Sequence, residues 1–370
     1  MAPHTPTALK ILFYGTPEFA LPALESLRAE HEIVTVVTQP DRPAHRGQKL
    51  TPPPVKLAAE AARLPVLQPP RLRDPEWPER LRALGADVAV VVAFGQILPQ
   101  AVLDAPTRGS INIHGSLLPR YRGAAPIQWA IIRGETVTGI TTFQMDAGMD
   151  TGPILRTADT PIGPEETAGE LSERLAPLGA RVILDTLARL DTLRATPQPA
   201  EGATLAPRLK KSDGVLDWTR PARELVNLVR GCNPWPGAMT STPAGPLTVW
   251  RARAVDGAGA PGTLIAHERT LAIATGAGAL LPLEVQPESR RTVAWDDYLR
   301  GARLTAGLAL AAPSRRPTES REIKPGMTPA EVRALLGEPG EEVVFERRTR
   351  WTFPDCTVIF EDGKVAEVRF

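Results

Sequence analysis

Short apolar runs alternate with helical patterns through the first 150 residues, and this alternation restricts the fold more than any other feature. The runs are rich in branched residues and lack strict apolar–polar alternation, as expected for parallel strands buried on both faces. Strands are expected over 11–14, 33–38, 88–94 and 111–113. The helical patterns between them cover 19–28, 55–62, 76–84 and 125–132. Strands that alternate with helices predict an α/β fold with a doubly wound, Rossmann-like sheet.

The end of this α/β unit and its first turn narrow the class of protein that the chain can be. Another strand is expected over 139–145, and a helix over 168–190 closes the unit. The first strand runs into Gly15-Thr-Pro-Glu-Phe, where a dinucleotide-binding fold would carry G-x-G-x-x-G. Because that fingerprint is missing, the pattern does not indicate a nicotinamide or flavin enzyme.

A stretch rich in proline, alanine and glycine, 195–207, is typical of a linker between a first domain, 1–206, and a second, 207–312. The second domain is expected to hold one helix, 221–231, and short strands between turns, which is typical of a small OB-like β-barrel. These strands are expected over 247–255, 263–266, 271–274 and 280–285. Residues 207–315 carry a net charge of +5, whereas the whole chain carries +1. This excess either marks a polyanionic partner or is ordinary solvated surface.

Residues 318–370 form a third pattern, a small α+β module of unknown role. Thr328 and Glu331 fit a helix capping box, and Gly337 with Pro339 would end that helix. Strands follow, and Asp362-Gly363 is a strong two-residue hairpin signal.

Composition excludes several classes of protein. The longest apolar run, 88–94, is far too short to span a bilayer, and residues 1–10 lack the pattern of a secretory signal. Cys232 and Cys356 have neither C-x-x-C spacing nor nearby histidine pairs, which argues against a zinc site or a disulfide framework. We therefore expect a cytoplasmic protein without a membrane partner or a bound metal.

Asn112 and His114 are the first candidate functional residues. They are two residues apart on an expected strand, so their side chains share a face. They lie at the carboxyl end of that strand, where open α/β sheets bind ligands. An amide that stabilises an oxyanion beside an imidazole that handles protons suits acyl transfer. The alternative is that both side chains merely tie down a turn.

Asp146 and Asp150 follow the next expected strand and also lie at its carboxyl end, so either could approach His114. A carboxylate there would orient the imidazole and favour its charged form. The alternative is that both residues belong to ordinary turns. Ser116 raises the possibility of a hydrolase, but the G-x-S-x-G elbow is absent and we reject that interpretation.

The segments around these residues resemble the methionyl-tRNA formyltransferase family. Asn112-x-His114 continues into Ser-Leu-Leu-Pro-Arg-x-Arg-Gly-Ala-Ala-Pro-Ile-Gln, and Gln144-Met-Asp-x-Gly-x-Asp-Thr-Gly follows. Gly15-Thr-Pro-Glu-Phe-Ala, Thr38-Gln-Pro-Asp-Arg-Pro and Asn233-Pro-Trp-Pro also match. The resemblance covers about residues 8–312 and leaves out 316–370.

The resemblance implies an enzyme that transfers the formyl group of 10-formyltetrahydrofolate to the amino group of methionine on initiator Met-tRNA, for translation initiation. It implies that Asn112, His114 and Asp150 are catalytic. The folate site would be lined by Ser116, Leu117, Leu118 and Pro119. The reaction would need no metal, and the enzyme would act as a monomer.

Two regions are expected to bind the tRNA. The loop 39–50 carries Arg42, Arg46 and Lys49 and no acidic residue after Asp41. The resemblance implies that this loop contacts the acceptor end, although it could be a surface loop with chance charges. Lys210 and Lys211 of the basic domain would contact backbone phosphates.

Two rival functions remain. A related folate-dependent formyltransferase for a sugar nucleotide or a purine-pathway amine would share the catalytic trio, but a small substrate would need neither the loop 39–50 nor the basic domain. A catalytically silent RNA-binding module would be expected to have lost part of the trio, and all three residues are present.

Overall fold

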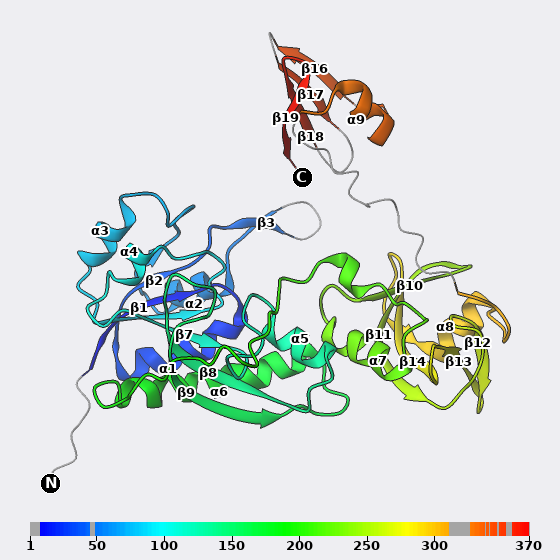
Figure 1. Ribbon diagram of the computed structural model, residues 1–370, viewed down its shortest axis with the longest axis horizontal. Coiled ribbons are helices and arrows are strands. Elements are labelled where there is room, and N and C mark those ends of the chain that lie inside the picture. Colours follow the sequence, from blue (N-terminus) through cyan, green and yellow to red (C-terminus); the bar gives the residue numbers. More distant parts are fainter. Residues whose placement is uncertain are drawn as a thin grey trace. The chain divides into compact units, whose positions relative to one another are not determined.

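The computed structural model describes residues 8–44, 49–310, 326–336, 338–339, 341–345, 348–352 and 357–369 (Figure 1). The chain divides into two compact units, Met1–Leu310 and Ala311–Phe370. Each unit has its own buried core. Among the described residues, no helix has both the length and the apolar composition needed to cross a membrane.

A seven-stranded sheet with the order β5-β2-β1-β6-β7-β8-β9 organises the first part of the larger unit. Its strands are β1 (Lys10–Gly15), β2 (Glu32–Val37), β5 (Val66–Leu67), β6 (Val88–Val92), β7 (Ser110–His114), β8 (Val137–Gln144) and β9 (Ile154–Pro161). The pairings from β5 to β7 are parallel, but β8 and β9 pair antiparallel. The sheet is therefore mixed: the four strands expected to be parallel, β1, β2, β6 and β7, pair in parallel, but β8 and β9 do not, and β9 was not expected.

Helices cover both faces of this sheet, as the doubly wound pattern predicts. They are α1 (Leu21–Glu30), α2 (Pro54–Ala61), α3 (Trp77–Arg82), α4 (Gln100–Leu103), α5 (Pro126–Ile132) and α6 (Ala168–Ala188), with a short 3-10 turn η1 (Glu18–Ala20). Residues of α1, α2, α5 and α6 share one core with Ile11 and Phe13 of β1. Residues of α3 and α4 share another with Leu12 and Tyr14. Because both faces are covered, β1 is buried continuously after its first residue.

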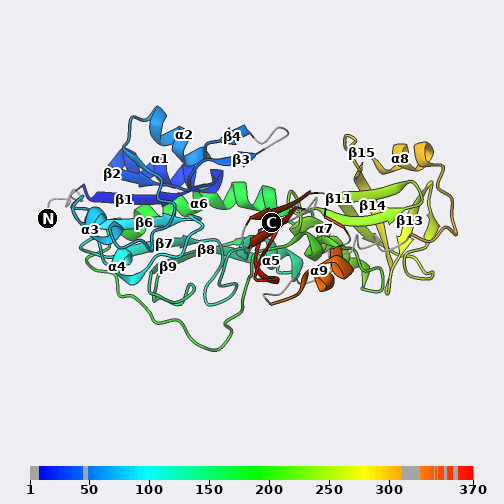
Figure 2. The ribbon, with the colours of Figure 1, turned by 90° about the horizontal axis from the view of Figure 1, so that it is seen from above.

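A small antiparallel pair, β3 (Arg42–Ala44) and β4 (Lys49–Thr51), follows β2. Both views place it on the side of β2 rather than of β9 (Figure 1, Figure 2). Arg46, one of the expected tRNA contacts, falls between these strands and lies outside the described residues.

The second part of the larger unit is an antiparallel sheet with the order β10-β11-β14-β13-β12, and β15 pairs with β14. Its strands are β10 (Ala238–Thr242), β11 (Gly245–Val255), β12 (Leu264–His267), β13 (Thr270–Ala274), β14 (Ala279–Pro287) and β15 (Val293–Ala294). Its helices are η2 (Lys211–Gly214), α7 (Ala222–Gly231) and α8 (Trp295–Ala302). The core of this part includes Ala125 and Ile132 from the first part, so the two parts share buried surface.

The smaller unit contains α9 (Pro329–Leu336) and an antiparallel sheet of β16 (Glu341–Phe345), β17 (Arg348–Thr352), β18 (Thr357–Glu361) and β19 (Lys364–Arg369). The predicted capping box is confirmed, since Thr328 Oγ1 accepts from the Glu331 N–H and the Thr328 N–H donates to Glu331 Oε2. Asp362 and Gly363 have φ values of 51° and 73° between β18 and β19, which confirms the predicted hairpin turn.

Candidate active site

The candidate site is built on β7 and on two loops, 115–125 after β7 and 145–153 after β8. Asn112 and His114 lie two residues apart on β7. The Asn112 side chain is half-buried and makes no hydrogen bond to another described residue. His114 is only 6% exposed. An unpaired amide beside a buried imidazole leaves polar groups available for a substrate.

The imidazole of His114 is fixed by its neighbours. Its Nε2 lies 2.9 Å from the carbonyl oxygen of Tyr121, an acceptor, so Nε2 carries hydrogen and donates. Its Nδ1 lies 3.8 Å from Asp150 Oδ2. The ring also meets Phe143 edge-on, with 6.3 Å between ring centroids. The ring edge that bears Nδ1 therefore faces the carboxylate, and the opposite nitrogen is engaged by the backbone.

Asp150 is held both through its carboxylate and through its own backbone carbonyl. Its Oδ2 accepts from the Gly123 N–H at 2.7 Å. Its own carbonyl, and that of Gly152, accept from Gln198 Nε2 at 2.9 and 2.7 Å. Asp150 has φ = 53°, an unfavourable value for a residue with a Cβ, which persists only where surrounding contacts determine it.

The route by which Asp150 reaches His114 differs from the expectation. Because β8 is antiparallel to β7, Gln144 at the end of β8 pairs with Ile111 near the start of β7. The carboxyl ends of β7 and β8 therefore lie at opposite ends of the sheet, so the expectation that Asp146 or Asp150 reaches His114 from a shared strand end is wrong. It is the loop 145–153 that carries Asp150 to His114, while Asp146 bonds within its own loop, to the Gly148 N–H and Thr151 Oγ1.

The four residues expected to line the folate site differ in accessibility. Ser116 is fully buried, and its hydroxyl donates to the Arg120 carbonyl at 2.7 Å. Leu118 is buried as well, with its N–H donating to Thr141 Oγ1. The Ser116 hydroxyl and the Leu118 backbone N–H thus support the conformation of the loop. Leu117 and Pro119 are half-buried, so theirs are the two side chains of this group that are accessible to a ligand.

The residues that hold His114 in place, Tyr121 and Thr204, were not predicted from the sequence. Tyr121 supplies the carbonyl that accepts from His114, and its own N–H donates to Thr204 Oγ1 at 2.8 Å. Its phenol donates to Glu135, and burial together with that bond raises the pKa of Tyr121 to about 12, so the phenol stays neutral. Thr204 belongs to the segment 195–207, which was interpreted only as a linker.

The expected tRNA residues lie apart from this trio in the sequence. Arg42 is exposed, and its Nη2 donates to Gln39 Oε1 at 3.1 Å. The backbone of Lys49 lies in β4, but its side chain is outside the described part. Lys210 and Lys211 are exposed and make no ion pair with a described residue. A cavity of about 300 Å³ is lined by Arg42, Arg71 and Arg73, among others, and by no acidic residue.

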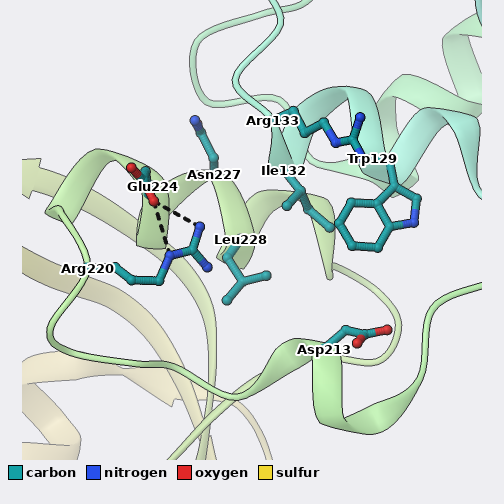
Figure 3. Close-up of a pocket in the computed structure, with 8 residues that line it drawn as sticks. All are labelled: Trp129, Ile132, Arg133, Asp213, Arg220, Glu224, Asn227 and Leu228. Atoms are coloured by element: carbon teal, nitrogen blue, oxygen red, sulfur yellow. Dashed lines mark hydrogen bonds and ion pairs between the residues drawn. The ribbon is translucent and has the colours of Figure 1, made fainter. Parts of the chain in front are cut away.

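A second cavity, of about 410 Å³, lies where α5 meets α7 (Figure 3). It is lined by Trp129, Ile132, Arg133, Asp213, Arg220, Glu224, Asn227 and Leu228. Arg220 is already paired with Glu224 at 2.9 Å, and the cavity contains as many acidic as basic side chains. It therefore offers no net attraction for phosphate, and none of the predicted site residues lines it.

No group of three His, Cys, Asp or Glu side chains within the described ranges is placed to hold a metal ion. Cys232 is buried, and burial raises the pKa of its thiol to about 12, so it is not a nucleophile near neutral pH.

The fold and this site agree with the family to which the chain is similar. Residues 9–187 match the family model described as "Formyl transferase", and residues 208–303 match "Formyl transferase, C-terminal domain". The chain belongs to the formyl transferase family. A solved N-formyltransferase from Helicobacter canadensis, in complex with folinic acid and dTDP-3-aminofucose, shares the fold with a TM-score of 0.56. That match has 18% identity and covers 74% of this chain and 98% of the other.

Two relatives define the particular activity. A methionyl-tRNA formyltransferase from Solibacter usitatus is 51% identical over 302 residues, which is 80% of this chain and 97% of the relative. One from Symbiobacterium thermophilum is 49% identical over 326 residues, 86% of this chain and 99% of the relative. The protein is an enzyme that formylates methionyl-tRNA.

Proposed function

We propose that Asn112, His114 and Asp150 catalyse transfer of the formyl group of 10-formyltetrahydrofolate to the amino group of methionine on initiator tRNA. The observation that carries this proposal is the arrangement around His114. Its Nδ1 lies 3.8 Å from Asp150, and its Nε2 is engaged by Tyr121. The Asn112 amide, which makes no hydrogen bond to another described residue, lies two residues away on the same face of β7.

In the proposed reaction, the amine of methionine attacks the formyl carbon and the carbonyl oxygen becomes an oxyanion. The Asn112 amide donates a hydrogen bond to that oxygen, and His114, protonated at both ring nitrogens in this proposal, donates a second one from Nδ1, while Asp150 orients the ring. Collapse of the intermediate breaks the bond between the formyl carbon and N10. The amine loses one proton and N10 gains one, so the products are formylmethionyl-tRNA and tetrahydrofolate. This chemistry requires no metal.

Residues 1–206 form the proposed folate-binding catalytic domain, and residues 207–312 form a proposed OB-like, basic tRNA-binding domain. The separate sheets of the two parts support this division, although they share buried surface. Residues 318–370 are a proposed appended module. We propose that the enzyme acts as a cytoplasmic monomer.

Arg42, Arg46 and Lys49 are the proposed contacts of the acceptor end, and Lys210 and Lys211 the proposed contacts of backbone phosphates. The exposure of Arg42, Lys210 and Lys211 and the acid-free cavity beside Arg42 support this assignment. Changing both lysines to alanine should weaken binding of any tRNA and flatten its salt dependence. An unchanged slope of binding against salt would count against phosphate contacts.

The acceptor is tested by measuring formyl transfer from 10-formyltetrahydrofolate to initiator Met-tRNA, free methionine and an amino sugar nucleotide in parallel. We expect efficient transfer to the tRNA alone. Preferred transfer to the sugar nucleotide would favour the rival small-molecule formyltransferase.

A further inference from the structure

The segment 195–207 approaches the candidate site through two side chains, in addition to backbone hydrogen bonds with Arg122 and Ile154. From Arg194 to Leu205 every residue is exposed except Gln198 and Thr204. Both of these residues bond to the loops that surround His114 and Asp150. A plain linker would not be expected to place half-buried polar side chains at a site, so these two contacts need a reason.

The carboxamide of Gln198 uses all of its hydrogen-bonding capacity. Its Nε2 donates to the carbonyl oxygens of Asp150 and Gly152 at 2.9 and 2.7 Å. Its Oε1 accepts from Arg122 Nε and Nη2 at 3.0 and 2.7 Å. Two donors and two acceptor positions are satisfied, so the orientation of the amide is determined by its partners.

These bonds close a ring around Asp150. The loop 115–125 holds Gln198 through Arg122, and it holds the Asp150 carboxylate through the N–H of the next residue, Gly123. Gln198 in turn holds the carbonyl of Asp150, whose φ of 53° is unfavourable without such support. The backbone and the carboxylate of Asp150 are thus positioned from opposite sides.

We propose that Gln198 is a positioning residue for catalysis, which acts by holding the Asp150 backbone so that its carboxylate stays at His114 Nδ1. This rests on the proposed catalytic role of Asp150. A residue that controls such an alignment has a large effect, since a misplacement of about 1 Å can cost roughly 100-fold in rate. The competing explanation is that Gln198 only fastens the segment 195–207 to the domain.

Two substitutions separate these explanations. Gln198→Ala removes the side chain, whereas Gln198→Glu keeps its shape and its contact with Arg122 but cannot donate to the two carbonyls when ionised. If Gln198 positions Asp150, both variants should lose about 10-fold or more in kcat, with KM for Met-tRNA and for the folate within about twofold of wild type. If Gln198 is only a fastening, Gln198→Glu should keep wild-type kcat, and that result would overturn the proposal. The matched control is Gln100→Ala, a change in an exposed glutamine of α4 whose side chain bonds to Asp104.

A double-mutant cycle with Asp150→Asn measures the coupling of the two residues in kcat. A merely structural role of Gln198 would not produce such coupling. If Gln198 acts through Asp150, Gln198→Ala should reduce kcat far less in the Asp150→Asn background than in wild type. Fully additive losses in kcat would overturn the proposal. Full activity of Asp150→Asn alone would instead remove Asp150 from the trio, so failure of the catalytic assignment and failure of the positioning role give different results. Melting temperatures of all variants identify any that do not fold. If Gln198→Ala does not fold, the kcat of Gln198→Glu decides between the two explanations.

Discussion

Asp146 and Asp150 lie in one loop, yet they make contacts of different kinds. Asp150 directs its carboxylate to the Gly123 N–H and toward His114. Asp146 accepts from Gly148 and Thr151 and so stabilises the turn that contains it. Two identical side chains therefore have different expected roles, one at His114 and one within the turn. The same substitution made at each position distinguishes these roles.

Asp150→Asn should lower kcat by about two decades, because an amide cannot supply the charge that orients and stabilises a protonated imidazole. Asp146→Asn should cost less in kcat, since it weakens only hydrogen bonds within the loop. Steady-state formylation assays with both variants provide the measurement. Equal activity of the two variants would contradict the assignment of Asp150.

Asn112, His114 and Asp150 were recognisable as one candidate trio only through their resemblance to family motifs, because the residues alone left Asp146 and Asp150 as alternatives. Gln198 was not, because its partners are backbone carbonyls of a loop that is distant in the sequence. Proline, alanine and glycine around it indicate a linker by composition. Which side chain of such a segment turns inward is decided by tertiary contacts that no local pattern records.

At the scale of elements, most helices and many strands follow from periodicity, but the short helices α4 and α8 and the direction of the strands do not. The predicted strand over 139–145 exists as β8, yet nothing in its own residues states that it runs antiparallel to β7. The edge strand β9 is only partly buried and mixes polar with apolar residues, so it lacks a strand pattern. Likewise β10, Ala-Met-Thr-Ser-Thr, is too polar to stand out although its alternate residues are buried.

The start of α6 links helix capping to the packing of the two sheets. Thr167 and Glu170 form a capping box, and Glu170 also pairs with Arg251 of β11. Hydrogen bonds from Thr167, then the pairing with Arg251, lower the pKa of the Glu170 carboxyl. A carboxyl with a lowered pKa in the folded state contributes stability above its unfolded pKa of about 4.3, and loses it as pH falls through the folded value.

Glu170→Gln should therefore lower the melting temperature at pH 7 by about 1–2 °C, a small effect because the pair is partly exposed. The difference from wild type should shrink as pH falls below about 4. Melting curves between pH 3 and pH 7 test this. Glu173→Gln, an exposed residue of the same helix without an ion pair to a described residue, should show no such dependence. A gap that stays constant with pH would exclude the charge of Glu170 as its cause.

At the scale of the whole molecule, the smaller unit stands outside the family likeness. The family models end at residue 303, and the relative from Solibacter usitatus is covered almost completely by 80% of this chain. The smaller unit has its own core of Val332, Trp351, Val358, Phe360 and Val365. These observations favour an appended module that is not needed for catalysis.

A chain that stops after Pro313 should keep the kcat, the folate affinity and the tRNA affinity of the full protein, and its melting temperature should change by less than about 2 °C. The full-length chain measured in parallel is the control. A loss of either affinity, or a drop of several degrees, would show that the module is an integral part of the enzyme.

We propose that His114, held between Tyr121 and Asp150, acts on the transition state of formyl transfer. The most direct test of this claim is the single-turnover rate of formyl transfer from 10-formyltetrahydrofolate to initiator Met-tRNA by His114→Ala, with both substrates saturating. We predict a fall of about 100-fold or more, as for loss of an oxyanion donor or acid–base group, with folate binding little changed. A rate within a few-fold of wild type would contradict the claim.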